Sequence, residues 1–196
     1  MIKILPATTC IFLSLHALGS NESPWYVDTQ LGYYKTRDSS YTNSLYTQEV
    51  FAQYTTKNDW GLYGFAYHDQ DFSAAYAGIA YSFDKLDLGI GAGPARYDET
   101  NWKVVNSWAY YSDDLLTISL YTEYVPEEIS NAEWFYKIQI DTSIWKNWYG
   151  GVYSERWYGT GPLLGYTFND HISVQISVPT FEKEDMKYAA SFIYIF

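Results

Sequence analysis

Short stretches in which apolar and polar residues alternate recur along the chain from residue 25 to its end. An alternation of period two places successive side chains on opposite faces of a β-strand. Twelve such stretches can be counted, which predicts about twelve strands. The third, fifth and tenth of them are weakly patterned, so ten or eight strands remain as alternatives. The predicted strands cover residues 25–36, 45–56, 60–67, 73–83, 86–93, 103–111, 115–125, 133–145, 148–157, 162–168, 171–178 and 187–196.

The connections between these predicted strands alternate in length. Every second connection is short and consists of turn-forming residues, whereas those between them are mostly longer and richer in charge. This rhythm, together with an even strand number, is typical of an antiparallel up-and-down barrel in a membrane, with both termini on the side of the short turns. The short connections are residues 57–59, 84–85, 112–114, 146–147 and 169–170, and two of the longer ones are 94–102 and 179–186.

The last nine residues form a strongly apolar strand that ends at the aromatic Phe196. An open edge of this kind invites aggregation in water, but a closed membrane barrel pairs its last strand with its first. The stretch resembles the C-terminal signature of Gram-negative outer-membrane β-barrels, in which the barrel assembly machinery reads a terminal Phe and the alternating aromatic residues before it. The resemblance assigns this role to Tyr188, Phe192, Tyr194 and Phe196.

The N-terminus has the features of a secretory signal peptide. Lys3 precedes a mostly apolar stretch, and Ala17 and Gly19 place small residues where a signal peptidase requires them. The stretch is short for a membrane anchor, and Pro6 and His16 weaken that alternative. We therefore predict a signal peptide over residues 1–19 and a single barrel domain over 20–196. The single cysteine, Cys10, lies in the signal, so the mature chain would have none.

The composition supports an all-β transmembrane barrel of about twelve strands. Aromatic residues make up 20% of the chain, yet the mean hydropathy is −0.27. A barrel needs this combination because only alternate residues face lipid, while rings gather at the two interfaces. A soluble β-sandwich also alternates, but it would not explain the signal and the terminal Phe. We thus expect the bacterial outer membrane as the location, with membrane lipid and lipopolysaccharide as neighbours.

Two sets of aromatic residues are expected to form girdles at the two headgroup levels. The set beside the short turns comprises Trp60, Phe83, Tyr111, Trp145, Trp148 and Phe168, and the set near the longer loops comprises Tyr41, Phe72, Tyr97, Trp102, Trp134, Trp157 and Phe181.

The inner face of the predicted barrel carries more acidic than basic residues. The alternation places Lys137 and Lys187 inside as bases, and the chain as a whole has a net charge of −11. An acidic lumen would favour cations or small neutral solutes over anions; alternatively, these groups are a satisfied polar filling. The candidate residues facing the lumen are Asp28, Glu49, Asp87, Glu123, Lys137 and Asp141.

Three inward glycines, Gly89, Gly91 and Gly93, would either leave room in a lumen or permit sharp curvature of the sheet. In size and layout the chain is similar to small twelve-stranded outer-membrane channels for acidic oligosaccharides. Those channels line their pores with basic residues, and this chain lacks such a column of arginines. Acidic sugars are therefore not the expected cargo.

No catalytic, metal or cofactor site is predicted. His171 and Ser173 are predicted on one inner face, as in outer-membrane lipid deacylases and phospholipases, but the residues around them do not match those motifs. No cluster of Lys and Arg suggests nucleic acid. The sequence favours a passive channel for cations or small neutral solutes. The alternatives are a surface-exposed structural or binding barrel without transport and, last, a lipid-modifying enzyme.

Overall fold

The computed structural model describes residues 24–36, 45–69, 72–97, 100–124, 134–156, 159–180 and 186–196. Predicted features in the other residues, including the signal peptide over 1–19, lie outside the described residues. Among the described residues, no helix has the length and apolar character needed to cross a bilayer. The strands are β1 (Trp25–Thr36), β2 (Leu45–Thr55), β3 (Trp60–His68), β4 (Phe72–Phe83), β5 (Leu86–Tyr97), β6 (Thr100–Ser112), β7 (Thr117–Tyr124), β8 (Trp134–Trp145), β9 (Trp148–Glu155), β10 (Gly159–Asn169), β11 (Ile172–Ser177) and β12 (Met186–Ile195).

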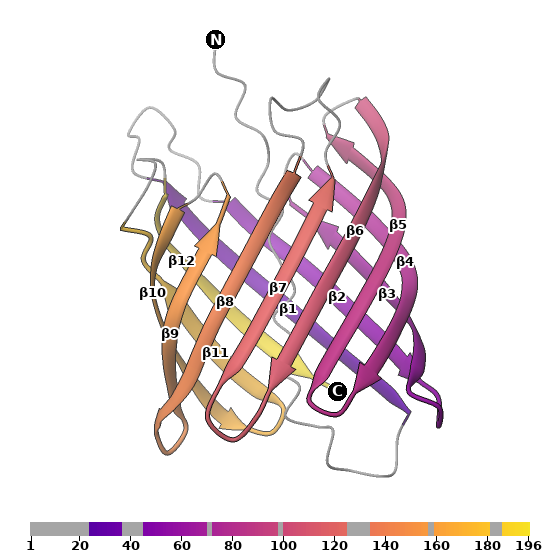
Figure 1. Cartoon of the computed structure of the whole chain (residues 1–196). Helices are drawn as coiled ribbons and strands as arrows, with labels where there is room; N and C mark the ends of the chain where they lie inside the picture. The colour runs from indigo at the N-terminus through magenta and orange to yellow at the C-terminus, as the bar shows by residue number, and fades with distance from the viewer. Residues whose placement is uncertain are drawn as a thin grey trace.

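These strands form one closed antiparallel barrel in which each strand pairs with its neighbours in sequence. β12 closes the barrel on β1, with Ile195 opposite Asp28 and Ala189 opposite Tyr34. The tilted strands, the short turns at one end and the C-terminus at that same end are visible in Figure 1. Closure removes both sheet edges, as an apolar terminal strand requires. The predicted all-β, up-and-down barrel of about twelve strands is confirmed.

The short turns are fixed by the residues that the sequence places there. Asp59, Asp84 and Lys146 have positive φ angles of 65°, 51° and 51°, which a two- or three-residue hairpin turn requires. In the β10–β11 turn, the Asn169 side-chain oxygen accepts hydrogen bonds from the backbone N–H groups of His171 and Ile172, both at 2.9 Å. The turn chemistry therefore helps to set the register of these four hairpins.

The hairpin of β5 and β6 is longer than the sequence predicts. Residues 94–102 were expected to form a loop, but Pro94 pairs with Lys103 and Tyr97 pairs with Thr100. Pro94 has no N–H to donate, and the pairing of β5 with β4 is interrupted between Ala92 and Ala95. The pairing of β5 with β6 is not interrupted there. The prediction of a loop here is wrong, because the ladder between β5 and β6 continues past Pro94.

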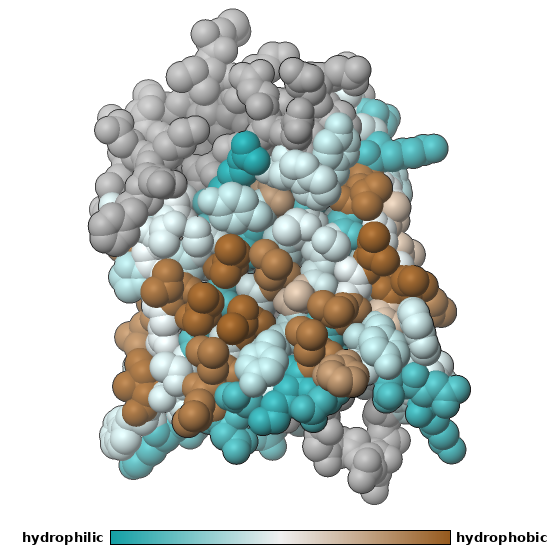
Figure 2. Space-filling view, viewed as in Figure 1, coloured by the Kyte–Doolittle hydropathy of each residue, from teal (hydrophilic) through white to brown (hydrophobic). Residues whose placement is uncertain are grey.

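The outer face of the barrel is apolar and the inner face is mixed. Figure 2 shows apolar side chains in a band across the wall, above a hydrophilic rim at the end of the short turns. Leu62 and Phe83 are more than three-fifths exposed, as lipid-facing side chains are when no lipid covers them. The rings exposed beside the short turns are Trp60, Phe83, Trp145, Trp148 and Phe168.

The second girdle differs from its prediction. Trp134 is exposed, but Phe72 is buried inside the barrel and packs on Trp102, with ring centroids 5.8 Å apart. These two rings were assigned to the membrane interface because they adjoin a longer connection, but their place in the alternation turns them inward. The side chains of Tyr41, Tyr97, Trp157 and Phe181 lie outside the described residues.

Candidate functional site

The candidate site is the interior of the barrel. Each sequence-predicted candidate there is buried in the structure, whereas the side chain of Lys187 lies outside the described residues. The outward neighbours of these residues, such as Ile140 and Leu120, are exposed. The buried candidates are Asp28 on β1, Glu49 on β2, Asp87 on β5, Glu123 on β7, and Lys137 and Asp141 on β8.

A group of charged side chains meets in the middle of the interior. Lys137 lies directly opposite Glu155 in the β8–β9 ladder. The charge of Lys137 also acts on Glu49, which comes from β2 on the far side of the barrel, and Glu49 in turn acts on Asp28. Among the described residues, Lys137 is the base that is buried with these carboxylates. The middle of the barrel therefore carries an excess of acidic groups.

Tyrosine hydroxyl groups satisfy some of the carboxylate oxygens. Glu123 Oε2 accepts hydrogen bonds from Tyr76 at 3.0 Å and from Tyr121 at 2.8 Å. Glu155 Oε2 accepts one from Tyr153. These bonds hold Glu123 and Glu155 at fixed positions in the interior.

Other carboxylate oxygens have no hydrogen-bond partner among the described residues, although each belongs to a side chain at most 2% exposed. They are both side-chain oxygens of Glu49, Oε1 of Glu123 and Oε1 of Glu155. A buried carboxylate oxygen without a donor is unfavourable, so a water molecule or a cation that reached one of these atoms would be stabilised there.

Aromatic rings cross the interior beside this charged group. The ring of Phe51 on β2 lies 5.7 Å from that of Trp108 on β6, and Tyr63 on β3 lies at the same distance from Trp108. The Tyr63 hydroxyl donates to Asn106 Oδ1 at 3.0 Å. Phe65 on β3 approaches Tyr121 on β7 to 6.3 Å. Strands that are several places apart in the barrel thus touch through their side chains, and the lumen is narrowed.

The inward glycines make room for these rings. A Cβ atom on Gly89 would lie 2.2 Å from the Trp108 ring nitrogen, and one on Gly91 would lie 2.3 Å from the Tyr63 hydroxyl oxygen. The sequence left open whether these glycines leave room inside the barrel or permit curvature of the sheet. The two short distances show that Gly89 and Gly91 leave room for a neighbouring side chain. That space is filled by aromatic side chains.

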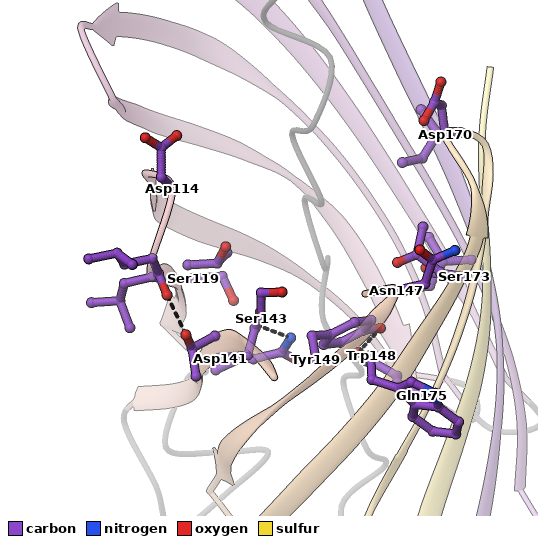
Figure 3. Close-up of a pocket in the computed structure, with 18 of the residues that line it drawn as sticks. Asp114, Ser119, Asp141, Ser143, Asn147, Trp148, Tyr149, Asp170, Ser173 and Gln175 are labelled. Carbon is purple, nitrogen blue, oxygen red and sulfur yellow. Dashed lines mark hydrogen bonds between the residues drawn. The ribbon is translucent and has the colours of Figure 1, made fainter. Parts of the chain in front are cut away.

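A cavity of about 320 Å³ opens at the end of the short turns. Asp114 and Asp141 lie on one side of it, and Asp170, Ser173 and Gln175 on the other (Figure 3). Such a volume is at the small end of the range for ligand sites.

Asp113 contributes a fixed charge to the lining of this cavity. Hydrogen bonds from the Tyr111 hydroxyl, at 2.7 Å, and from the backbone N–H groups of Leu115 and Leu116 lower the pKa of Asp113. This carboxylate therefore stays ionised at neutral and mildly acidic pH.

His171 and Ser173 do not come together in the structure. His171 is exposed and its Nδ1 lies 2.9 Å from the Ile195 carbonyl oxygen, whereas Ser173 is buried inside the barrel. The prediction that both share one inner face is wrong, because the β10–β11 turn ends after His171 and frees it from the strand alternation. Among the described residues, no group of three His, Cys, Asp or Glu side chains is placed to hold a metal ion.

Two features of the site were not predicted from the sequence. Glu155 is 1% exposed and belongs to the central charged group. The alternation of Tyr149, Gly151, Tyr153 and Glu155 along β9 was the signal for its inward position. The cavity at the short turns had no such signal, since three separate turns and seven strands, β6 to β12, contribute to it.

Comparison with known proteins relates the chain to outer-membrane barrels by fold. No protein-family model matches the chain, and no curated protein is similar to it in sequence. Among solved structures, the chain is similar to "KdgM porin", with a TM-score of 0.53 and 12% identity over 86% of this chain and 98% of that one. It is also similar to "Bacterial polysaccharide outer membrane secretin", with a TM-score of 0.52 and 10% identity over 89% of this chain and 99% of that one. The chain therefore has the fold of porin-like outer-membrane barrels.

Proposed function

We propose that this protein is a narrow channel of the bacterial outer membrane that favours small cations and small neutral solutes over anions. The observation that carries the proposal is the excess of buried carboxylates: Asp28, Glu49 and Glu155 belong to the central charged group with Lys137, and Glu123 is a further buried carboxylate of the interior. Several of the carboxylate oxygens have no hydrogen-bond partner among the described residues. A low-dielectric wall strengthens the field of such charges and raises the local concentration of cations.

The porin fold supports this proposal. A solved structure of the same fold is named a porin, and the closed barrel with its apolar outer face fits a membrane. We further propose that the chain is exported by a signal peptide over residues 1–19 and is inserted by the barrel assembly machinery. Lipopolysaccharide and other membrane lipids would then surround the barrel.

A second candidate function is a structural or binding barrel that does not conduct. The rings of Phe51, Tyr63 and Trp108 favour it, because they touch one another across the interior. The two candidates differ in one measurable property, the current through a single inserted barrel. Recordings of the refolded protein in a planar lipid bilayer decide between them.

In a salt gradient, we expect the reversal potential of the channel to show a preference for cations. The triple variant Glu49→Gln, Glu123→Gln, Glu155→Gln should bring the ratio of cation to anion permeability close to unity, because it removes charge and nearly preserves shape. The preference of the unmodified channel should also weaken at 1 M salt, where the screening length is about 3 Å. Asp84→Asn is the matched control, since Asp84 lies in the exposed short turn between β4 and β5 and not in the interior. Anion preference in the unmodified protein would contradict the proposal.

The orientation in the membrane is tested by labelling single cysteines on intact cells. We expect cysteines at Asn131 and Glu184 to react with a reagent that does not cross the membrane, and cysteines at Asn58 and Asn147 to be protected. Asn58 and Asn147 belong to short turns, which face the periplasm in outer-membrane barrels. Permeabilised cells provide the control, because all four positions should then react. The reverse pattern on intact cells would overturn the assignment.

A further inference from the structure

We propose that the cavity at the end of the short turns binds a small organic cation that carries primary ammonium groups. The site lies at the mouth of the barrel, and it is argued from other contacts than the central charged group. The inference therefore goes beyond the proposed channel function, and its test needs no current.

The charge of the cavity selects the sign of the ligand. Four carboxylates line it: Asp113, Asp114, Asp141 and Asp170. Lys146 also lines it, but its ammonium group lies 4.6 Å from the ring centroid of Trp145, an exposed ring on the outer face. The carboxylates therefore outnumber the basic group, and the cavity attracts a cation.

Two buried side chains of β8, Gln139 and Asp141, provide hydrogen-bond acceptors at one side of the cavity. Gln139 is only 5% exposed, and its Nε2 donates to Asp141 Oδ2 at 2.7 Å. Its Oε1 atom is buried and has no hydrogen-bond partner among the described residues, and Gln139 is one of the residues that line the cavity. The amide oxygen of Gln139 therefore needs a hydrogen-bond donor. An ammonium group has three N–H donors and a positive charge that also suits the neighbouring carboxylate.

Aromatic rings complete the surroundings that an ammonium group requires. Tyr110 and Tyr149 line the cavity, and Tyr110 is 1% exposed. The Tyr149 hydroxyl donates to Gln175 Oε1 at 3.3 Å, across β10, which holds the Tyr149 ring in place. Ring faces attract ammonium groups and contribute more when the site excludes water.

The arrangement disfavours other ligand classes. A metal ion needs several ligands within a short radius, and no group of three acidic, His or Cys side chains in the described part of the chain is so placed. An anion would meet four carboxylates. A neutral polyol would fit the volume, but it would gain nothing from their charge. The carboxylates come from different sides of a cavity of about 320 Å³, so a short ion with an ammonium group at each end can reach two of them at once.

The test is isothermal titration calorimetry of the folded full-length barrel in detergent micelles with 1,4-diaminobutane. We expect saturable binding, and weaker or no binding of 1,4-butanediol, which matches the probe in length but is neutral. Asp141→Asn should weaken binding about tenfold, which corresponds to about 1.4 kcal/mol. Asn147→Asp, in an exposed turn of the lining, should strengthen binding and keeps the test valid if the Asp141 variant does not fold.

Asp84→Asn is the matched control, because Asp84 lies in a short turn at the same end but does not line the cavity. Its affinity for the diamine should equal that of the unmodified protein. An equal loss of affinity in Asp84→Asn would overturn the proposal, since it would show a general effect of net charge. Equal binding of the diol, tighter binding of Mg²⁺ than of the diamine, or no binding of the diamine would also overturn it.

Discussion

Replacing Phe196 with Asp is expected to abolish most insertion of the barrel into the outer membrane. The Phe196 ring is 69% exposed on the lipid side and packs edge-on against Tyr194, with centroids 4.7 Å apart. The Phe196 N–H donates to the Val27 carbonyl oxygen at 3.0 Å, which ties the end of the chain to β1. The substitution removes the last ring of the assembly signature and about 1.5–3 kcal/mol of apolar transfer energy.

The measurement is the fraction of protein in the outer membrane that migrates differently when the sample is not boiled. Phe168→Asp is the matched control, because Phe168 is also an exposed ring at the end of the short turns but belongs to β10. If the signature matters beyond its apolar character, Phe168→Asp should retain far more folded protein than Phe196→Asp. Equal folded fractions in the two variants would contradict a specific role of the terminal residue.

Phe51→Ala is expected to raise the single-channel conductance and to destabilise the barrel. The Phe51 side chain is fully buried and contacts Tyr63 and Trp108, with ring centroids 5.8 Å and 5.7 Å away. Truncation removes one of the rings that narrow the lumen. The loss of a buried Phe side chain typically costs about 3–5 kcal/mol in unfolding free energy.

Planar-bilayer recordings measure the conductance, and denaturant-induced unfolding in micelles measures the stability. Phe83→Ala is the control, since Phe83 is exposed on the outer face and its truncation leaves the lumen unchanged. An unchanged conductance in Phe51→Ala, despite lower stability, would show that solutes do not pass beside this ring. Absence of current from both variants and from the unmodified protein would favour the barrel that does not conduct.

The strands, the short turns and the closed barrel could be predicted from the amino-acid sequence, apart from the full length of the β5–β6 hairpin. These features depend on local patterns, because side-chain direction in a strand has a period of two and a tight turn is set by two or three residues. Asp59, Asp84 and Asn169 show this, since each stabilises the predicted turn through its own backbone or side chain. The aromatic C-terminal strand likewise required a partner, and β1 is that partner.

The way in which side chains fill the interior could not be predicted from the sequence. The approach of Phe51 to Trp108, the placing of Glu49 near Lys137 and the use of Gly89 as space for a ring join strands that are far apart in sequence. These contacts depend on the tilt of the strands and on side-chain rotamers across the lumen, which a pattern along one strand does not contain. The cavity at the short turns has the same origin, because distant turns meet there only when the barrel closes.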